Sequence, residues 1–187
     1  MRTPSLPLLE NPASESPLEL QATARVTRTG SCITVVYTLC GSINDISWPD
    51  SADQIFTDGL WQGTCFEAFV ALPTESGYIE INATSSGAWA AYSFSDYRVK
   101  VSNLTKTKVL LSRAECSAQE VMVRCIFDLS TLPNYALATR LDFGITMVIK
   151  SLIGKCHYFA LAHPGPMPDF HDRRGFMLSL PFSQVEE

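Results

Sequence analysis

The sequence predicts an all-β protein, an antiparallel β-sandwich of about nine or ten strands. Short runs of alternating apolar and polar residues, or of β-branched residues, recur from position 18 to position 180, and both patterns are typical of strands. Gly-containing turns, such as Thr-Glu-Ser-Gly at 74–77 and Ser-Ser-Gly at 85–87, separate several of these runs and favour hairpins. No long amphipathic helix and no internal repeat interrupts the pattern, which favours two packed sheets.

The expected strands follow one another with short connections. Positions 18–27 alternate, and positions 32–39 are rich in β-branched residues. Positions 43–58 contain Pro49 and several aspartates and predict a loop. Positions 130–138 are the one stretch that favours a helical turn, with Ser130 as its N-cap. Further strands are expected at 64–72, 78–84, 88–94, 108–114, 121–129, 141–151, 157–162 and 176–180.

Length and composition indicate a single folded domain. The 187 residues are 46% hydrophobic and 18% charged, which suits a globular chain with a sizeable core. Residues 1–16 are rich in Pro, Ser and Glu, so we expect them to form an irregular N-terminal arm. Residues 17–182 would form the sandwich and residues 183–187 a C-terminal tail.

The charge and hydropathy patterns exclude two classes of partner. The formal net charge is -5, and the longest cluster of basic residues is Arg173-Arg174, whereas nucleic-acid binding needs a basic surface. No apolar stretch is long enough for a transmembrane helix. The apolar run near the N-terminus is short and broken by Pro, unlike a signal peptide. We therefore expect a cytoplasmic protein that binds neither nucleic acid nor membrane.

The six cysteines form no recognisable pairing or metal motif. No Cys-x-x-Cys occurs, and most of the cysteines lie in apolar, strand-like runs: Cys32, Cys40, Cys65, Cys116, Cys125 and Cys156. In a reducing compartment such residues behave as small buried hydrophobes. We expect them in the core rather than in disulfides.

The most informative stretch begins at Trp61 and continues in a strand-like alternation that carries Glu67. In the next expected strand, 78–84, the polar residues Glu80 and Asn82 share one face and the isoleucines share the other. The polar face suits the lining of a groove. Trp61 itself stands at the entrance of a strand, where a buried ring would anchor the loop, so it is the candidate whose position most favours a structural role.

Together with the segments that follow, these side chains supply what a sugar site needs. Sugars are held by aromatic rings that stack on their C–H faces and by carboxylates, amides and guanidinium groups that bond their hydroxyls. The candidate ligand-binding residues of this cluster are Trp61, Glu67, Glu80, Asn82, Trp89, Tyr92 and Arg98. Core tryptophans and a solvated polar face are the alternatives. Whether Glu67 faces Glu80 depends on strand register, which the sequence does not give.

A second candidate segment, residues 160–173, combines prolines with His163, Asp169 and His171. Prolines fix an extended loop, and the three side chains could ligate a metal, although no zinc-binding motif accompanies them. We favour the alternative that they bond backbone groups and pin the loop, and we add His163 and His171 to the candidate ligand-binding residues. No catalytic residue is predicted, because neither a nucleophile elbow nor a phosphate-binding loop occurs.

Six segments occur in a fixed order: Asp58-Gly-Leu-Trp61-Gln-Gly-Thr-Cys-Phe-Glu67, Tyr78-Ile-Glu-Ile-Asn82, Ser86-Gly-Ala-Trp-Ala-Ala-Tyr92, Asp96-Tyr97-Arg98, Tyr158-Phe-Ala-Leu-Ala-His-Pro164 and Pro168-Asp-Phe-His171. In this order they resemble the bacterial DOMON-like domain proteins, a branch of the superfamily that includes family-9 carbohydrate-binding modules. One departure is Asn11-Pro12, where many relatives are expected to carry His-Pro. The resemblance covers positions 18–180 and implies a jelly-roll sandwich with a ligand groove. It implies no catalytic residue, and relatives in the superfamily bind sugars or haem.

We therefore predict a non-catalytic module that binds a carbohydrate or a similar small polar metabolite and needs no cofactor. One alternative is haem or metal binding, for which Met147, His157 and His163 are the axial-ligand candidates. Another is an enzyme that uses Glu67 and Glu80, or His171, since paired carboxylates carry out glycoside hydrolysis. Ligand identity and oligomeric state do not follow from the sequence.

Overall fold

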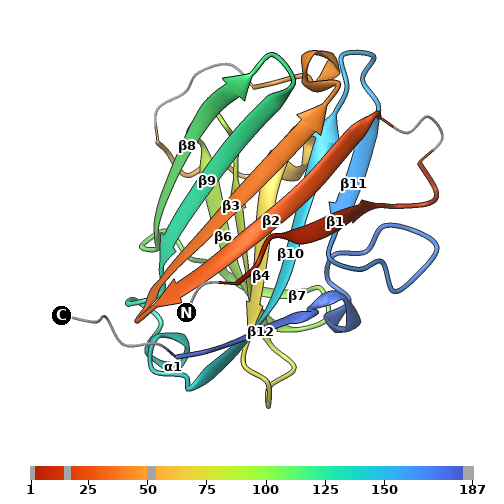
Figure 1. Cartoon of the computed structure of the whole chain (residues 1–187). Coiled ribbons are helices and arrows are strands. Elements are labelled where there is room, and N and C mark those ends of the chain that lie inside the picture. The colour runs from red at the N-terminus through yellow and green to blue at the C-terminus, as the bar shows by residue number, and fades with distance from the viewer. Residues whose placement is uncertain (1–2, 15–17, 50–53, 183–187) are drawn as a thin grey trace.

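Two antiparallel sheets face each other in the computed structural model of the chain (Figure 1). It describes residues 3–14, 18–49 and 54–182, the side chains of 111–116 excepted. These residues form twelve strands and almost no helix. The predicted antiparallel sandwich is thus confirmed, with more strands than the nine or ten expected. The predicted tail, 183–187, lies outside the described residues.

The first sheet has the order β2-β3-β9-β8. Its strands are β2 (Leu20–Thr29), β3 (Cys32–Gly41), β8 (Lys108–Ser117) and β9 (Glu120–Asp128). Every second residue of β2, β3 and β9 is buried, which is the pattern of strands with one face on the core and one face in water.

The second sheet has the order β7-β6-β5-β4-β10-β11, and a short strand, β12, pairs with the first half of β10. Its strands are β4 (Cys65–Ala71), β5 (Tyr78–Ala83), β6 (Trp89–Asp96), β7 (Val99–Asn103), β10 (Arg140–Lys150), β11 (Cys156–Ala160) and β12 (Leu178–Pro181). Both faces of β4 and β5 are buried. The outer face of this sheet is therefore covered, although it is turned away from the core.

Strand β1 (Leu6–Glu10) joins the two sheets and corrects the prediction of an irregular arm over 1–16. Its first half pairs with β2 and its second half with β11. Pro7 and the short length hide the strand in the sequence, because main-chain pairing to two neighbours holds it rather than a long apolar pattern. Leu8 is the residue of β1 that reaches the core.

The core lies between the sheets and confirms the predicted faces of β5. Ile79, Ile81 and Ala83 pack into it from β5. Phe66 of β4 and Phe159 of β11 join them from neighbouring strands. Residues that alternate with these, such as Glu80, point to the outer face.

The short helical segments lie in connections. They are η1 (Ile43–Asp45), η2 (Leu60–Gln62), α1 (Pro133–Ala136) and η3 (Arg173–Gly175). The predicted helical turn is α1, but its N-cap is Leu132 rather than Ser130, whose hydroxyl instead donates to Asp128 at 2.8 Å. In the described part of the chain, every helix is too short or too polar to cross a membrane.

The cysteines follow the alternation of their strands rather than all entering the core. Cys65 and Cys125 are buried, as predicted. Cys32, Cys40 and Cys156 are only half-buried, because their strands turn these positions to the outer faces. Cys32, Cys65, Cys125 and Cys156 are free thiols, and the side chain of Cys116 lies outside the described part of the chain.

Candidate ligand-binding cleft

A cleft of about 420 Å³ opens on the outer face of the second sheet. Strands β4 to β7, β10 and β11 supply its floor, and loop 161–177 and η2 supply its rim. The lining residues are Trp61, Glu67, Phe69, Glu80, Tyr92, Phe94, Arg98, Lys100, Val148, Tyr158, Pro168, Phe170 and His171. Its size and its mixture of rings and charged groups are those of a small-molecule site.

Two carboxyl groups share the floor of this cleft. In the pairing of β4 with β5, Glu67 is opposite Asn82 and Phe69 is opposite Glu80, so Glu67 and Glu80 are diagonal neighbours on one face. Their exposed fractions are 3% and 5%. The question left open by the sequence is therefore answered: the two carboxylates lie on the same side of the sheet.

Burial makes ionisation of both carboxyl groups unfavourable. It raises the pKa of Glu67 well above its ordinary value, and repulsion from Glu80 adds to the effect. Burial also raises the pKa of Glu80 to about 6, although a hydrogen bond from Asn82 and the charges of Lys100 and Arg98 oppose it. The two buried carboxyl groups thus resist carrying two negative charges, and Glu67 is the harder of the two to ionise.

The floor also contains polar atoms without protein partners. Glu67 Oε1 and Asn82 Oδ1 are buried and have no hydrogen-bond partner among the described residues. The other Glu67 oxygen accepts a long hydrogen bond of 3.4 Å from Thr146. Since buried polar atoms are normally satisfied, Glu67 Oε1 has unused capacity to bond a group that enters the cleft.

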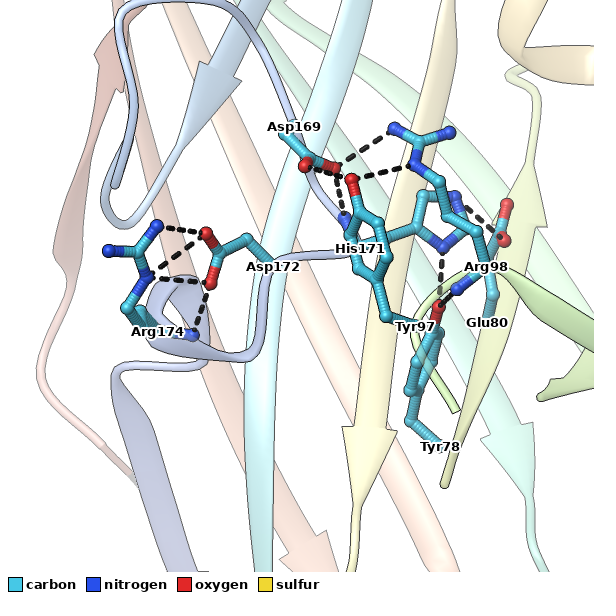
Figure 2. A network of polar contacts seen from close by, with 8 residues as sticks. All are labelled: Tyr78, Glu80, Tyr97, Arg98, Asp169, His171, Asp172 and Arg174. Atoms are coloured by element: carbon cyan, nitrogen blue, oxygen red, sulfur yellow. Dashed lines mark hydrogen bonds and ion pairs between the residues drawn. The ribbon is translucent and has the colours of Figure 1, made fainter. Parts of the chain in front are cut away.

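A hydrogen-bond network ties loop 161–177 to the wall of the cleft (Figure 2). The Tyr78 hydroxyl lies 2.7 Å from His171 Nδ1 and accepts from the Arg98 main-chain N–H at 3.1 Å. Arg98 binds Asp169 at 2.9 Å, and the Tyr97 hydroxyl donates to the same carboxylate at 2.6 Å. Strand β5, the turn between β6 and β7, and the loop are thus held together at one point.

This network bears on the protonation of His171. The Tyr78 hydroxyl, which accepts from Arg98, can donate its own proton to His171 Nδ1, and in that arrangement the imidazole proton lies on Nε2. Burial, with the nearby charge of Arg98, lowers the pKa of His171 to about 4. The neutral ring turns Nε2 toward Glu80 Oε2 at 3.8 Å, which is longer than a hydrogen bond.

Trp61 stands at the rim of the cleft, and 44% of its surface is exposed. This corrects the expectation of a buried anchor. Trp61 lies in η2, which follows Gly59 in the left-handed conformation, φ 77°, so the chain turns sharply and carries the indole outward. Its ring meets Tyr92 edge-on at 6.1 Å, and the residue keeps a large exposed surface.

Tyr92 lines the cleft but offers no open face for stacking. It is buried, and Lys100 Nζ lies 3.9 Å above its ring centre. The Tyr92 hydroxyl donates to Asp58, and this bond holds the pKa of Asp58 below its ordinary value. Tyr92 therefore supports Trp61 and Lys100 rather than contacting a ligand broadly.

Two other residues of the predicted site, Trp89 and Asn82, do not line the cleft. Trp89 is opposite Ala83 on the core face and packs against Phe56, edge to face, at 5.4 Å. Asn82 is fully buried and donates to Glu80 Oε1 at 2.6 Å, so it orients the carboxylate from below. Trp89 lies outside the cleft because residues three apart in a regular strand, such as 89 and 92, face opposite sides.

The three metal candidates do not gather at one site. His163 Nε2 bonds the Leu9 carbonyl at 2.8 Å and is absent from the lining of the cleft. Asp169 and His171 bond side chains of the wall, as described above. All three side chains thus pin the loop, but only His163 and Asp169 bond the backbone groups that the favoured alternative named. Among the described residues, no group of three or more His, Cys, Asp or Glu side chains could hold a metal ion.

The candidate haem ligands are also dispersed. Met147 is buried in the core between the sheets. His157 is buried and bonds Glu10 of β1 at 2.9 Å through Nδ1. Neither lines the cleft.

Sequence reasoning missed several residues that line the cleft, among them Phe69, Phe94, Lys100, Tyr158 and Phe170. Two of them carried a usable signal. Phe69 is two residues from Glu67, and Phe94 is two residues from Tyr92, so each shares the face of a residue already chosen. The others depend on the register of β7 and β11 and on the course of the loop.

Three solved structures share this fold at low sequence identity. A candidate carbohydrate-binding protein from Bacteroides uniformis matches with a TM-score of 0.72 and 16% identity, over 96% of this chain and 86% of that chain. A family-9 carbohydrate-binding module from Caldicellulosiruptor kristjanssonii matches in complex with cellotriose, with a TM-score of 0.55 and 8% identity over 96% and 84% of the chains. In complex with glucose the corresponding values are 0.58, 7%, 96% and 85%. No protein-family model and no curated protein matches the sequence.

Proposed function

We propose that the protein is a non-catalytic module that binds a carbohydrate. The exposed indole of Trp61 at the rim of a polar-floored cleft is the observation that carries the proposal. An aromatic ring that stays in water at the mouth of a cleft can stack on the C–H face of a sugar, and its burial by the ligand would be favourable.

The floor and wall supply hydrogen bonds for the sugar hydroxyls. Glu80 accepts, His171 Nε2–H donates, and the 3.8 Å between them leaves both groups able to bond one ligand hydroxyl. Arg98, whose side chain is half exposed, adds charged donors at the rim. These groups are held by the network with Tyr78 and Asp169 before any ligand arrives, which reduces the entropic cost of binding.

Similarity of fold and the order of sequence segments add support. The family-9 module that shares it is known in complex with cellotriose and with glucose, and we extend a saccharide ligand to the present chain. The ordered segments from Asp58 to His171 favour membership of the DOMON-like branch.

The test is a titration of glucose, cellotriose and a panel of other saccharides into the protein by isothermal calorimetry. We expect Trp61→Ala to weaken binding at least tenfold, because loss of a stacking ring removes more than about 1.4 kcal/mol. Phe182→Ala is the control, since Phe182 is comparably exposed, at 39%, and lies outside the cleft. If the wild-type protein bound no saccharide in the panel, the proposal would be wrong.

A glycoside hydrolase is the second candidate. Glu67 and Glu80 share the cleft, and a carboxyl group with a pKa of about 6 suits a general acid. Binding is favoured because burial also raises the pKa of Glu67, whereas a hydrolase needs its second carboxyl group ionised as nucleophile or base. Release of reducing sugar that Glu80→Gln abolishes would establish the enzyme, and binding without turnover would establish the module.

A further inference from the structure

A second, smaller hollow adjoins the cleft. It measures about 270 Å³ and lies between the N-terminal segment, β11 and loop 161–177, where its lining includes Ser14, Cys156 and Met167. Tyr158 and Pro168 line both hollows, so the two spaces share a boundary. Small-molecule sites usually enclose about 300–1,000 Å³, so the second hollow suits an extension of the first better than a separate site.

The shared boundary is built to support a ligand that crosses it. Tyr158 lies on the outer face of β11, opposite Val148 of β10, and is half-buried. Its ring meets Phe170 edge-on at 6.0 Å. An aromatic ring with a polar tip between two hollows offers an apolar surface and a hydroxyl to whatever lies across it.

The second hollow repeats the combination found in the first. At its rim, Met167 is 67% exposed, as Trp61 is exposed at the rim of the cleft. In its wall, the hydroxyl oxygen of Ser14 is buried and has no hydrogen-bond partner among the described residues. His157 and Lys155 add further polar groups to the lining. A hydroxyl-bearing ligand would satisfy Ser14 Oγ, as in the first hollow it would satisfy Glu67 Oε1.

From these observations we infer that the cleft and the second hollow form one groove for a linear oligosaccharide, with a sugar ring in each hollow and Tyr158 beneath the linkage. The inference rests on the proposed function and adds a requirement for ligand length. A monosaccharide fills the cleft alone, whereas a trisaccharide also reaches the second hollow. Contacts to the second ring add binding free energy at little further cost in lost translational and rotational freedom.

The experiment compares monosaccharide and trisaccharide of the same sugar by calorimetry, with glucose and cellotriose, xylose and xylotriose, mannose and mannotriose. We expect the trisaccharide of the preferred sugar to bind at least tenfold more tightly than its monosaccharide. Cys156→Phe, which places a ring in the second hollow, should reduce this ratio to less than threefold and leave monosaccharide affinity unchanged. Met167→Ala, which shortens the exposed side chain at the rim and adds nothing to the hollow, should also reduce the ratio.

Met177→Ala is the matched control, because Met177 is equally exposed, at 67%, lies on the same loop and lines neither hollow. Thermal melting of each variant verifies that it is folded. A wild-type ratio near one, or a ratio that Cys156→Phe and Met167→Ala both leave unchanged, would overturn the two-hollow groove while monosaccharide binding upheld the proposed function. Failure of the wild-type protein to bind any of the six sugars would overturn both.

Discussion

Replacement of Glu80 by Gln should stabilise the protein at neutral and alkaline pH and leave its stability nearly unchanged in acid. Burial raises the pKa of Glu80 from 4.5 to about 6. Each pKa unit corresponds to about 1.4 kcal/mol, so the ionised carboxylate costs about 2 kcal/mol of folding free energy above pH 6. Gln has nearly the same shape and keeps the acceptor for the Asn82 amide, which donates at 2.6 Å, while it removes the charge.

The sign of the effect follows from proton linkage. The folded pKa of Glu80 is higher than the unfolded one, so its favourable contribution is present below about pH 4.5 and is lost as the pH rises through 6. His171 acts in the opposite direction. Its pKa falls from 6.5 to about 4 in the folded protein, so its contribution is present above pH 6.5 and is lost as the pH falls to 4. The effects of Glu80 and His171 on the unfolding free energy oppose each other near pH 5. The difference in unfolding free energy between the wild-type protein and the Glu80→Gln variant isolates the contribution of Glu80.

The assay is urea unfolding, followed by tryptophan fluorescence in reducing buffer, of wild-type and Glu80→Gln proteins from pH 4.5 to pH 8. The difference in unfolding free energy should grow from within about 0.5 kcal/mol of zero at pH 4.5 to about 2 kcal/mol in favour of the variant at pH 7.5. Glu75→Gln, in the exposed β4–β5 turn, should change stability by less than about 0.5 kcal/mol. A difference that is independent of pH would refute the reasoning, because it would identify a lost contact rather than ionisation as the cause.

Two further substitutions test the placement of the core and of the loop. Trp89→Ala should lower the unfolding free energy by about 3 kcal/mol in the same assay, since it leaves a cavity in the core. A variant that was fully stable but bound sugar poorly would contradict this and would indicate that Trp89 contacts the ligand. Gly144→Ala should cost about 1–2 kcal/mol and speed proteolysis of loop 161–177, because its Cβ would lie 2.9 Å from the Phe176 ring that packs under that loop. Gly165→Ala, with no neighbour closer than 3.9 Å, is the control for loop composition, and equal proteolysis of the two variants would contradict the packing argument.

The sequence predicted the strands wherever alternation or β-branched residues set them, and it failed where pairing alone makes a strand. Strand β7 is exposed along its whole length, so it has no buried face and no apolar period for a sequence pattern to display. Strand β1 is short, contains Pro7 and is divided between two sheets. In both cases main-chain hydrogen bonds to the neighbouring strands determine that the segment is a strand. The side-chain composition gives little indication of this pairing.

The candidate site was predicted in residue type more than in arrangement. Side chains alternate between the two faces of a strand, so residues two apart share a face. This already places Glu67 with Phe69, and Glu80 with Asn82. The same alternation places Trp89 and Tyr92, three residues apart, on opposite faces. The sequence itself therefore argued against assigning both to one site. The structure was needed for the register between strands and for the loop, more than fifty residues beyond β7, that returns to cover these residues.

Burial of the two carboxyl groups comes from that loop rather than from the core. Glu67 and Glu80 lie on the outer face of the sheet, where strands of a sandwich usually meet water. Phe176 and His171 of the loop pack against Phe69 at 5.7 and 5.3 Å and enclose this face. The loop thus creates the low-dielectric floor that raises the carboxyl pKa values and, through the neutral His171, supplies a donor for the ligand. Loop docking and ligand recognition therefore depend on the same contacts, and a substitution that loosens the loop, such as Gly144→Ala, should lower ligand affinity and the pKa of Glu80 together.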